Sequence, residues 1–274
     1  MRLYLALAAA VALALIASAL PSQKAIEIHA SAGILSEHEL QAIEQLAPQQ
    51  QAERLLERAI SRYTGALDQI ENRLPSWAGK LDYSKELQSL TSLAYNSREL
   101  RVRAAAIELT LSAFRIAKEP QAARSFMDKL KLSTENRPWN LWVLALLANR
   151  GVEAVEARRI LLEFLRDPDD NTREWAVNSL AMIGSDNVID ALLDVFGHDK
   201  CLAVRERAGC GLAESGMMTQ EQRRKAIPGL VRLMDDSTLD EKTQSWVFQA
   251  LQEISGQNHG TDRAAWRTWH NKQR

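Results

Sequence analysis

Glycine, proline and cysteine are all scarce in this sequence of 274 residues, with 12, 7 and 2 copies respectively. Glycine and proline interrupt helices, so their scarcity favours a mostly helical chain. The two cysteines, Cys201 and Cys210, lie nine residues apart, where a helix would separate them by about 13 Å. A disulfide needs Cα atoms within about 7 Å, so we expect two free thiols. The 46% of hydrophobic residues is ample for a continuous core.

An excess of positive charge is also missing. The sequence holds 34 Lys and Arg against 35 Asp and Glu, which gives a formal net charge of −1. Proteins that bind nucleic acids usually show a basic excess or a basic stripe. We therefore expect neither a nucleic acid nor a charged membrane surface as a partner.

Motifs for catalysis and metal binding are almost absent. The sequence has no glycine-rich phosphate loop, G-x-S-x-G elbow, S-x-x-K pair or C-x-x-C motif. His38-Glu39 begins like a zinc-protease helix, but the fifth position is Ala42. His198 and Cys201 offer too few ligands for zinc. The sequence thus predicts no catalytic residue, metal site, cofactor or small-molecule substrate.

One long apolar run is present, from Leu3 to Leu20, and it predicts export. Ala17-Ser18-Ala19 supplies the small residues at which signal peptidase cleaves. About 18 apolar residues also approach the length that spans a bilayer, so residues 1–20 are either a cleaved signal peptide or a membrane anchor. The rest of the chain is then periplasmic or secreted, or anchored in the inner membrane by residues 3–20.

After a polar linker at 21–36, residues 37–75 have a strongly helical pattern. Pro48 suits the first position of a long helix that Pro75 ends. Apolar residues follow a heptad spacing along it, at Leu56, Ile60, Tyr63, Leu67, Ile70 and Leu74. The segment is either an amphipathic helix that caps the following domain or a short coiled coil that dimerises.

Three later stretches align without a gap at steps of 33 and 32 residues. They are "NLWVLALLANRG" at 140–151, "REWAVNSLAMIG" at 173–184 and "RERAGCGLAESG" at 205–216. A fourth, looser copy follows at 243–254, and 100–114 resembles a degenerate first copy. Repeats of this period predict a helical solenoid, here over 82–274.

The aligned copies predict the core of the solenoid. Each places two apolar residues four apart on one helical face, as Val143 and Leu147, Ala176 and Leu180, Ala208 and Leu212, and Val247 and Leu251. Second helices also align, through Ile160-Leu161, Leu192-Leu193 and Leu230-Val231. Six extra residues at 217–222 belong to a turn, where they leave the stacking face intact.

These copies resemble HEAT repeats of the bacterial type, which are also called HEAT/PBS-lyase-like. The resemblance is carried by Asp167, Arg173, Ala176, Leu180 and Gly184, and by Asp199, Val204-Arg205, Ala208, Leu212 and Gly216. It implies an all-α fold, a right-handed α-α superhelix of the HEAT/armadillo type. It also implies that each arginine pairs with the aspartate six residues before it, in a turn between repeats. Separately, the alternating oxygens of the segment 167–171, DPDDN, suggest calcium binding, but the glycine and closing glutamate of an EF-hand are missing, so we expect the segment to cap a helix.

The C-terminus is similar to an ending of exported bacterial HEAT proteins. Gly256 ends a helix, Asp262 can cap a short final one, and Trp266 and Trp269 lie on one face of that helix. We expect this face to cover the open end of the solenoid.

Three of the seven tryptophans occupy one repeat position, as Trp142, Trp175 and Trp246, with Arg207 in the remaining copy. Equivalent residues form a column in a solenoid. The column either packs between repeats or forms a partly exposed strip that binds a peptide or glycan.

The predicted second helices carry charges of alternating sign, from Arg158 and Arg159 through Asp190 and Asp194 to Arg223, Arg224 and Lys225. Such a surface suits a protein partner better than a phosphate backbone. The sequence therefore predicts an exported or membrane-tethered, non-catalytic scaffold for an unknown protein or peptide. The alternative from another class is an enzyme on a HEAT scaffold, such as a bilin-lyase-like protein.

Overall fold

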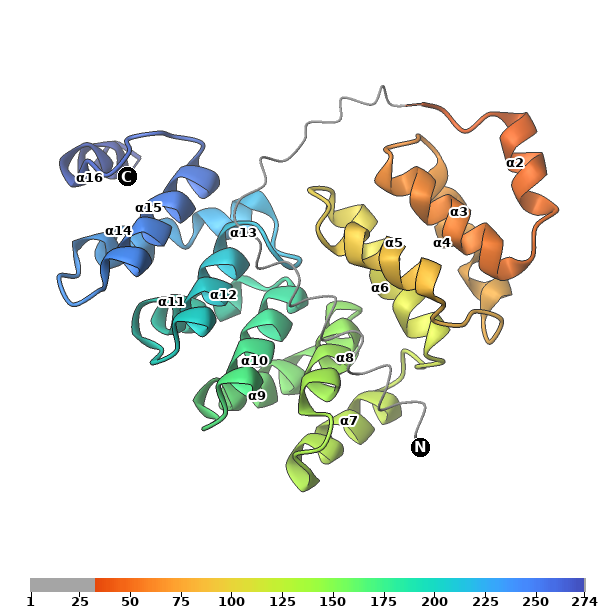
Figure 1. Cartoon of the computed structure of the whole chain (residues 1–274), viewed down its shortest axis with the longest axis horizontal. Helices are drawn as coiled ribbons and strands as arrows, with labels where there is room; N and C mark the ends of the chain where they lie inside the picture. Colours follow the sequence, from red (N-terminus) through yellow and green to blue (C-terminus); the bar gives the residue numbers. More distant parts are fainter. Residues whose placement is uncertain (1–32, 274) are drawn as a thin grey trace. The chain divides into compact units, whose positions relative to one another are not determined.

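The structure is a computed structural model that describes residues 33–273 (Figure 1). Helices account for its regular structure in this range, and the β-structure there is one isolated bridge between Ile34 and Thr64. The predicted signal or anchor segment, residues 1–20, lies outside the described residues. None of the described helices is both long and apolar enough to cross a bilayer. The chain divides into two compact units, Met1–Lys118 and Glu119–Arg274.

The first unit contains one lone helix and two helical hairpins. The lone helix is α2 (Glu37–Glu44), and the hairpins pair α3 (Pro48–Ile60) with α4 (Ala66–Trp77) and α5 (Lys85–Tyr95) with α6 (Leu100–Ala113). Helix α3 also packs on α5, and α4 packs on α6. The two hairpins share one core, in which the fully buried side chains include Leu55, Leu56, Ile70 and Leu87.

The predicted long helix from Pro48 to Pro75 is wrong. A turn at residues 61–65 separates α3 from α4, and Arg62 (φ 61°) and Gly65 (φ 90°) take left-handed backbone conformations there. The chain reverses at this turn, so α4 packs back on α3. The heptad spacing therefore marks two faces of one hairpin and does not form a coiled-coil seam. Pro75 lies inside the last turn of α4, which ends at Trp77.

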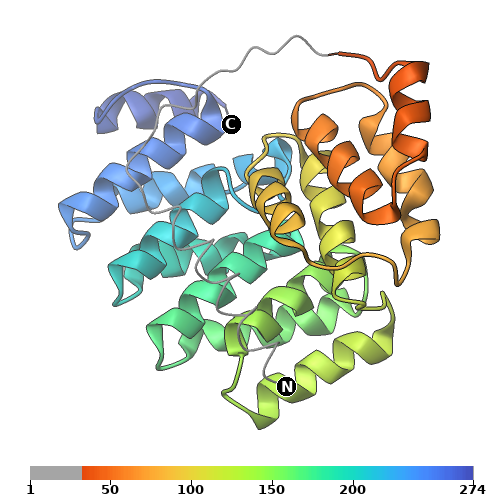
Figure 2. The same ribbon diagram turned by 45° about the vertical axis from the view of Figure 1, so that its right-hand side comes forward.

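The second unit is built from two layers of helices. We call the first the A layer: α8 (Arg137–Asn149), α10 (Asp170–Ile183), α12 (Leu202–Ala213) and α15 (Glu241–Ser255). The B layer contains α7 (Pro120–Leu132), α9 (Ala154–Glu163), α11 (Ile189–His198) and α14 (Ile227–Asp235). Successive A-layer helices pack against each other, and each also packs on a B-layer helix (Figure 2). This arrangement confirms an all-α, HEAT-like solenoid.

The aligned core positions are buried as the repeat predicts. All eight side chains, Val143, Leu147, Ala176, Leu180, Ala208, Leu212, Val247 and Leu251, have 0% of their surface exposed. Each fully buried Leu or Val contributes about 1.5–3 kcal/mol relative to an exposed one. One hairpin cannot bury this face alone, so the repeats stabilise each other by stacking.

Two glycines, Gly184 and Gly216, allow close backbone contact between the C-terminal ends of α10 and α12. Gly184 and Gly216 both have left-handed φ angles, 74° and 76°. A Cβ on Gly216 would lie 2.3 Å from the carbonyl oxygen of Ala181, and that oxygen accepts a hydrogen bond from the Met217 N–H at 2.9 Å. Only glycine fits this close approach.

Smaller elements complete the unit. These are the 3₁₀ turns η1 (Phe164–Arg166) and η2 (Asp186–Val188) and the helices α13 (Gln220–Arg224) and α16 (Arg263–Asn271). As expected, Asp262 caps α16 by accepting the Ala265 N–H at 3.0 Å. Trp266 is fully buried, its ring lies edge-on to Trp269, and α16 packs on α14.

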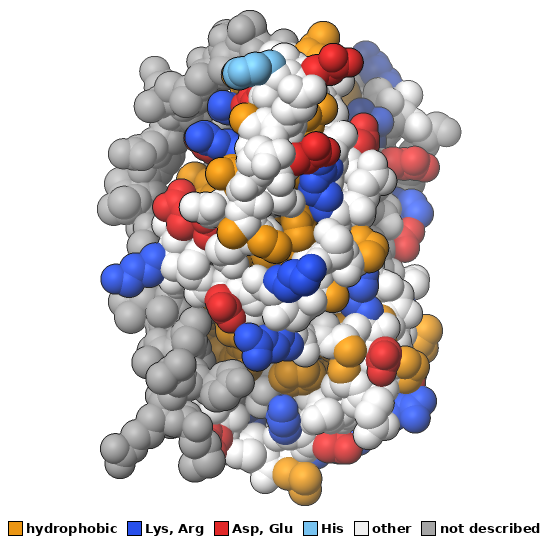
Figure 3. All heavy atoms as spheres, turned by 90° about the vertical axis from the view of Figure 1, so that its right-hand side faces the viewer, with side chains coloured by type: hydrophobic (Ala, Val, Ile, Leu, Met, Phe, Trp, Pro, Cys, Tyr) orange, Lys and Arg blue, Asp and Glu red, His pale blue; other side chains and the backbone are white. Residues whose placement is uncertain are grey.

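Charges of both signs are interspersed on one face of the molecule. The face shown in Figure 3 mixes Lys and Arg with Asp and Glu, and hydrophobic side chains are scattered among them. This mixture agrees with the near-zero net charge of the sequence.

Candidate functional site

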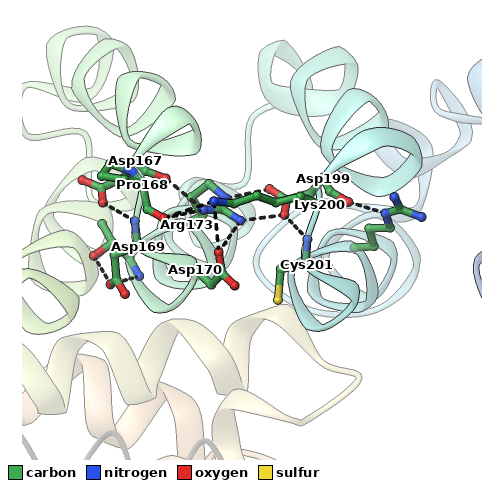
Figure 4. Close-up of polar contacts among 10 residues, drawn as sticks. Asp167, Pro168, Asp169, Asp170, Arg173, Asp199, Lys200 and Cys201 are labelled. Atoms are coloured by element: carbon green, nitrogen blue, oxygen red, sulfur yellow. Dashed lines mark hydrogen bonds and ion pairs between the residues drawn. The ribbon is translucent and has the colours of Figure 1, made fainter.

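A cluster of hydrogen bonds and ion pairs surrounds Arg173, in the first turns of α10 (Figure 4). The side chain of Arg173 is 4% exposed. Its Nε and Nη2 donate to the Asp199 carboxylate at 2.8 and 2.9 Å, and Nη2 also donates to Asp170 at 2.7 Å. Its Nη1 donates to the backbone carbonyls of Asp167 and Pro168 at 2.9 and 3.2 Å. All five N–H donors of the guanidinium are therefore used.

Similar arginines link the neighbouring repeats. Arg137 donates to the Asp167 carboxylate at 3.0 Å, and Arg205 donates to the Asp240 carboxylate at 2.7 Å. Arg205 also donates to the backbone carbonyl of Asp199. Each arginine thus contacts a carboxylate that follows it by 26 to 35 residues along the chain.

This geometry corrects the pairing that the HEAT resemblance implied. Arg173 meets the aspartate six residues before it through a backbone carbonyl, and Arg205 does the same. The Asp167 carboxylate accepts the Asp169 N–H at 2.9 Å, which closes its own turn, and it also accepts Arg137 from the preceding repeat. Arg137 lies outside the aligned arginine position, so the alignment missed it.

A shallow hollow of about 310 Å³ opens beside this cluster, between η1 and the end of α11. Arg173 and Asp199 line it, but their polar atoms already bind each other. At the exposed rim, His198 Nδ1 lies 3.1 Å from an Asp194 carboxylate oxygen, and Lys200 Nζ donates to the Pro168 carbonyl at 3.3 Å. The cluster can therefore hold two repeats together, and the exposed charged side chains of the hollow are those of Arg166, Asp194, His198 and Lys200.

The DPDDN segment caps a helix, as predicted. Asp169 is the N-cap of α10, and its carboxylate accepts the Thr172 N–H at 2.8 Å and the Thr172 hydroxyl at 2.7 Å. The hydroxyl and the N–H both lower the pKa of Asp169. Within residues 33–273, no three His, Cys, Asp or Glu side chains form a group that could hold a metal ion.

Both cysteines are free thiols, as predicted. Burial raises the pKa of Cys210 to about 11, so its thiol stays protonated and unreactive at neutral pH. Cys201 is the N-cap residue of α12.

The tryptophan column divides into a buried part and a partly exposed part. Trp142 and Trp175 are 3% and 7% exposed, and their rings pack edge-on with centroids 6.1 Å apart. These two rings therefore pack between repeats and cannot form a surface strip. Trp246 is only half-buried, with Lys242 Nζ 5.0 Å from its ring centroid. Arg207 is also half-buried, and it lies 3.5 Å from Glu174 on the neighbouring α10.

The basic cluster at 223–225 divides in the same way. Arg223 is 4% exposed, and it donates to the carbonyls of Gly211, Leu212 and Ser215 at 2.7–2.9 Å. It satisfies the C-terminal end of α12, so it is not available to a partner. Arg224 is exposed, and Lys225 is exposed and paired with Asp186.

The charged residues of the other second helices lie at or near the surface. Arg159 is exposed and binds Glu156 and Glu163, whereas Arg158 is half-buried. Asp190 and Asp194 are exposed on α11. The predicted alternation of charge along the second helices is therefore incomplete, because Arg223 is buried, Arg224 and Lys225 belong to α13 and its C-cap, and Arg159 is paired with glutamates of its own helix.

A comparison with protein families matches residues 125–213 to HEAT repeats. The match covers most of α7 and continues to the end of α12, which includes the arginine cluster and the Trp142–Trp175 pair. No curated protein matches the chain. The repeats, their stacked helices and the family match agree that residues 125–213 form HEAT repeats.

Proposed function

We propose that this protein is a non-catalytic scaffold that binds a protein or peptide through the part of the A layer formed by α12 and α15. HEAT repeats generally serve as scaffolds for protein interactions. The observation that carries the proposal is the division of the tryptophan column. Trp142 and Trp175 are used inside the fold, whereas Arg207 and Trp246 keep part of their side chains in solvent.

The surroundings of Arg207 and Trp246 suit a protein partner. Arg and Trp are the residue types most enriched at binding hot spots. Exposed polar side chains flank them on α12, at its C-cap and on α15, namely Glu206, Glu214, Gln249 and Glu253. A polar rim around a partly buried aromatic is typical of protein interfaces.

The pairing of buried charges supports a role without catalysis. Arg173 and Arg223 use their donors on carboxylates and on backbone carbonyls of adjacent turns. A general acid or base must be open to a substrate, with a pKa near the working pH. The Asp199 and Asp170 carboxylates bind the Arg173 guanidinium instead, and this hydrogen bond lowers the pKa of Asp170.

The superhelix is right-handed in this proposal, as the resemblance to HEAT repeats implies. We also propose that the chain is exported or tethered to the membrane. Export follows from the apolar run at residues 3–20 and its Ala17-Ser18-Ala19 site. Fractionation of cells that produce the full chain tests it: a shortened soluble form outside the cytoplasm indicates cleavage, and a full-length membrane form indicates an anchor. Full-length protein in the cytoplasm would contradict both.

Co-purification from the exported fraction tests the scaffold. We compare the wild type with two double variants, Arg207→Ala/Trp246→Ala and Arg224→Ala/Lys225→Ala. The proposal predicts partner proteins that the wild type and the second variant retain and that the first loses. Identical partners in all three samples would exclude the α12 and α15 surface as the binding site.

A further inference from the structure

A groove in the first unit goes beyond the proposed A-layer surface. We propose that the groove between α3 and α5 binds a basic amphipathic helix of a partner protein. Its volume is about 340 Å³, and α3 and α5 form its walls. Its lining residues are Leu46, Gln50, Glu53, Arg54, Glu57, Glu86 and Leu90.

The groove combines an apolar surface with an acidic rim. Leu90 is buried, Leu46 is half-buried, and Leu93 is 60% exposed one turn beyond Leu90 on α5. Residues 86, 90 and 93 lie on one helical face, so Leu93 continues the line from the groove into solvent. A leucine of this exposure beside a groove gives an apolar anchor point for a docked helix.

The charges of the lining are unbalanced. Three carboxylates, on Glu53, Glu57 and Glu86, face one guanidinium, that of Arg54. Glu57 and Arg54 form an ion pair at 2.8 Å, but both side chains are nearly half exposed, so a docked cation can replace Arg54. Glu86 is exposed and forms no ion pair within the described part of the chain.

Glu53 has a structural role at the same place. Its carboxylate accepts the Ser84 hydroxyl at 2.6 Å and the Gln49 amide at 2.7 Å, which ties α3 to the N-terminus of α5. The wall of the groove is therefore fixed before a partner binds. Glu57 and Glu86 remain adaptable, and they are the residues that a partner's lysines and arginines would meet.

These features select one kind of partner. The negative rim disfavours nucleic acids and anionic membranes, because both repel carboxylates. Two packed helices leave a groove into which a third helix fits, with apolar residues at i, i+3, i+4 and i+7. A basic face on that helix complements the rim and speeds association at low salt.

The test uses the full chain and a fluorescent peptide of about 18 residues, or five helical turns, with leucine on one face and lysine on the other. Fluorescence anisotropy measures its dissociation constant. One control peptide has the same composition in scrambled order, and another has glutamate in place of lysine. We expect only the amphipathic lysine peptide to bind, with affinity that falls as salt rises.

The variant Glu57→Lys/Glu86→Lys should weaken binding at least about tenfold, since it reverses two charges of the rim. Leu93→Asp should also weaken peptide binding, because it replaces the apolar anchor point beside the groove with a charge. The matched control Glu119→Lys/Glu135→Lys makes the same charge change at two exposed glutamates of the second unit and should bind like the wild type. Circular dichroism of each variant checks that it is folded.

Equal binding of the scrambled peptide, or unchanged binding by Glu57→Lys/Glu86→Lys, would overturn the inference. Sedimentation equilibrium tests whether a second copy of the chain fills the groove instead. A wild-type dimer that Glu57→Lys/Glu86→Lys disrupts would show this and would also overturn the inference. None of these groove variants changes Arg207 or Trp246. Failure here would therefore leave the A-layer proposal standing, and the co-purification experiment tests that proposal separately.

Discussion

Single residues join the repeats of this protein, and Arg173 is the clearest case. Its guanidinium is buried and binds Asp199 and Asp170 together with two backbone carbonyls. Removal of one partner from a buried ion pair leaves an uncompensated charge, which costs more than the pair contributes. A residue selected by the repeat alignment therefore has a structural role between two repeats.

We predict that Arg173→Ala lowers the free energy of unfolding by about 3–5 kcal/mol, since the Asp199 carboxylate is then buried without its partner. Urea denaturation followed by circular dichroism measures the change. Arg205→Ala serves as the control, because Asp240 is far more exposed than Asp199, and its cost should be about 1 kcal/mol. Equal costs for the two variants would contradict a special role of Arg173.

The N-cap Asp169 predicts a dependence of stability on pH. Its hydrogen bonds to Thr172 lower its pKa in the folded state. The stability it contributes is present above the unfolded pKa of about 3.9 and is lost as pH falls through the lowered folded value. Asp169→Asn keeps a capping oxygen without the charge, so it should be less stable at pH 7, by less than about 1 kcal/mol.

Denaturation curves at several pH values check this prediction. The difference between Asp169→Asn and the wild type should begin to shrink as pH falls below about 4, where the carboxylate becomes protonated in the unfolded state, and it should vanish below the lowered folded pKa. A difference that stays constant down to pH 2 would show that the charge of Asp169 does not matter.

At the scale of helices, the sequence predicted the features that recur in every repeat. It missed those that depend on contacts between neighbouring helices. The aligned stretches are α8, α10, α12 and α15, and the 3.6-residue period alone placed their buried faces. The partner of Arg173 could not be predicted, since it depends on how the next repeat stacks. The turn at 61–65 was missed because its apolar spacing continues through it and Arg62 gives no signal for a left-handed φ.

The turn between α3 and α4 can be tested at Gly65. Its φ is 90°, and a Cβ added there meets nothing within 4 Å, so Gly65→Ala changes only the backbone preference. We expect a loss of about 1 kcal/mol in the free energy of unfolding. Ser61→Ala, at an ordinary conformation in the same turn, should cost less than about 0.5 kcal/mol. If Gly65→Ala stabilised the protein, a continuous helix would be favoured over the hairpin.

Substitutions of the adjacent Arg223 and Arg224 test whether α13 stabilises the C-terminal end of α12. Arg223→Ala leaves three carbonyls at the end of α12 without their donor, and we expect a loss of about 2–3 kcal/mol. Arg224→Ala removes an exposed side chain and should change stability by less than about 0.5 kcal/mol. Thermal unfolding of both variants makes the comparison. Similar losses in the two would refute the capping role of Arg223.

At the scale of the whole molecule, stacked repeats create surface that no single hairpin has. In the second unit, the buried Trp142–Trp175 pair stabilises the stack, and the same repeat position carries exposed atoms of Arg207 and Trp246 further along. The sequence predicted the column but not its division, because burial depends on what covers each ring. One repeat position therefore carries buried rings at α8 and α10 and, at α12 and α15, the partly exposed side chains that we propose bind a partner.

Hydrogen exchange of the full chain, with and without a co-purified partner, tests the scaffold proposal most directly. The amides of α12 around Arg207 and of α15 around Trp246 should exchange more slowly in the complex, because the partner covers this surface and suppresses local opening. The first turns of α10, which the Arg173 cluster already holds, should change little. Unchanged exchange in α12 and α15, with protection confined to other helices, would contradict the account.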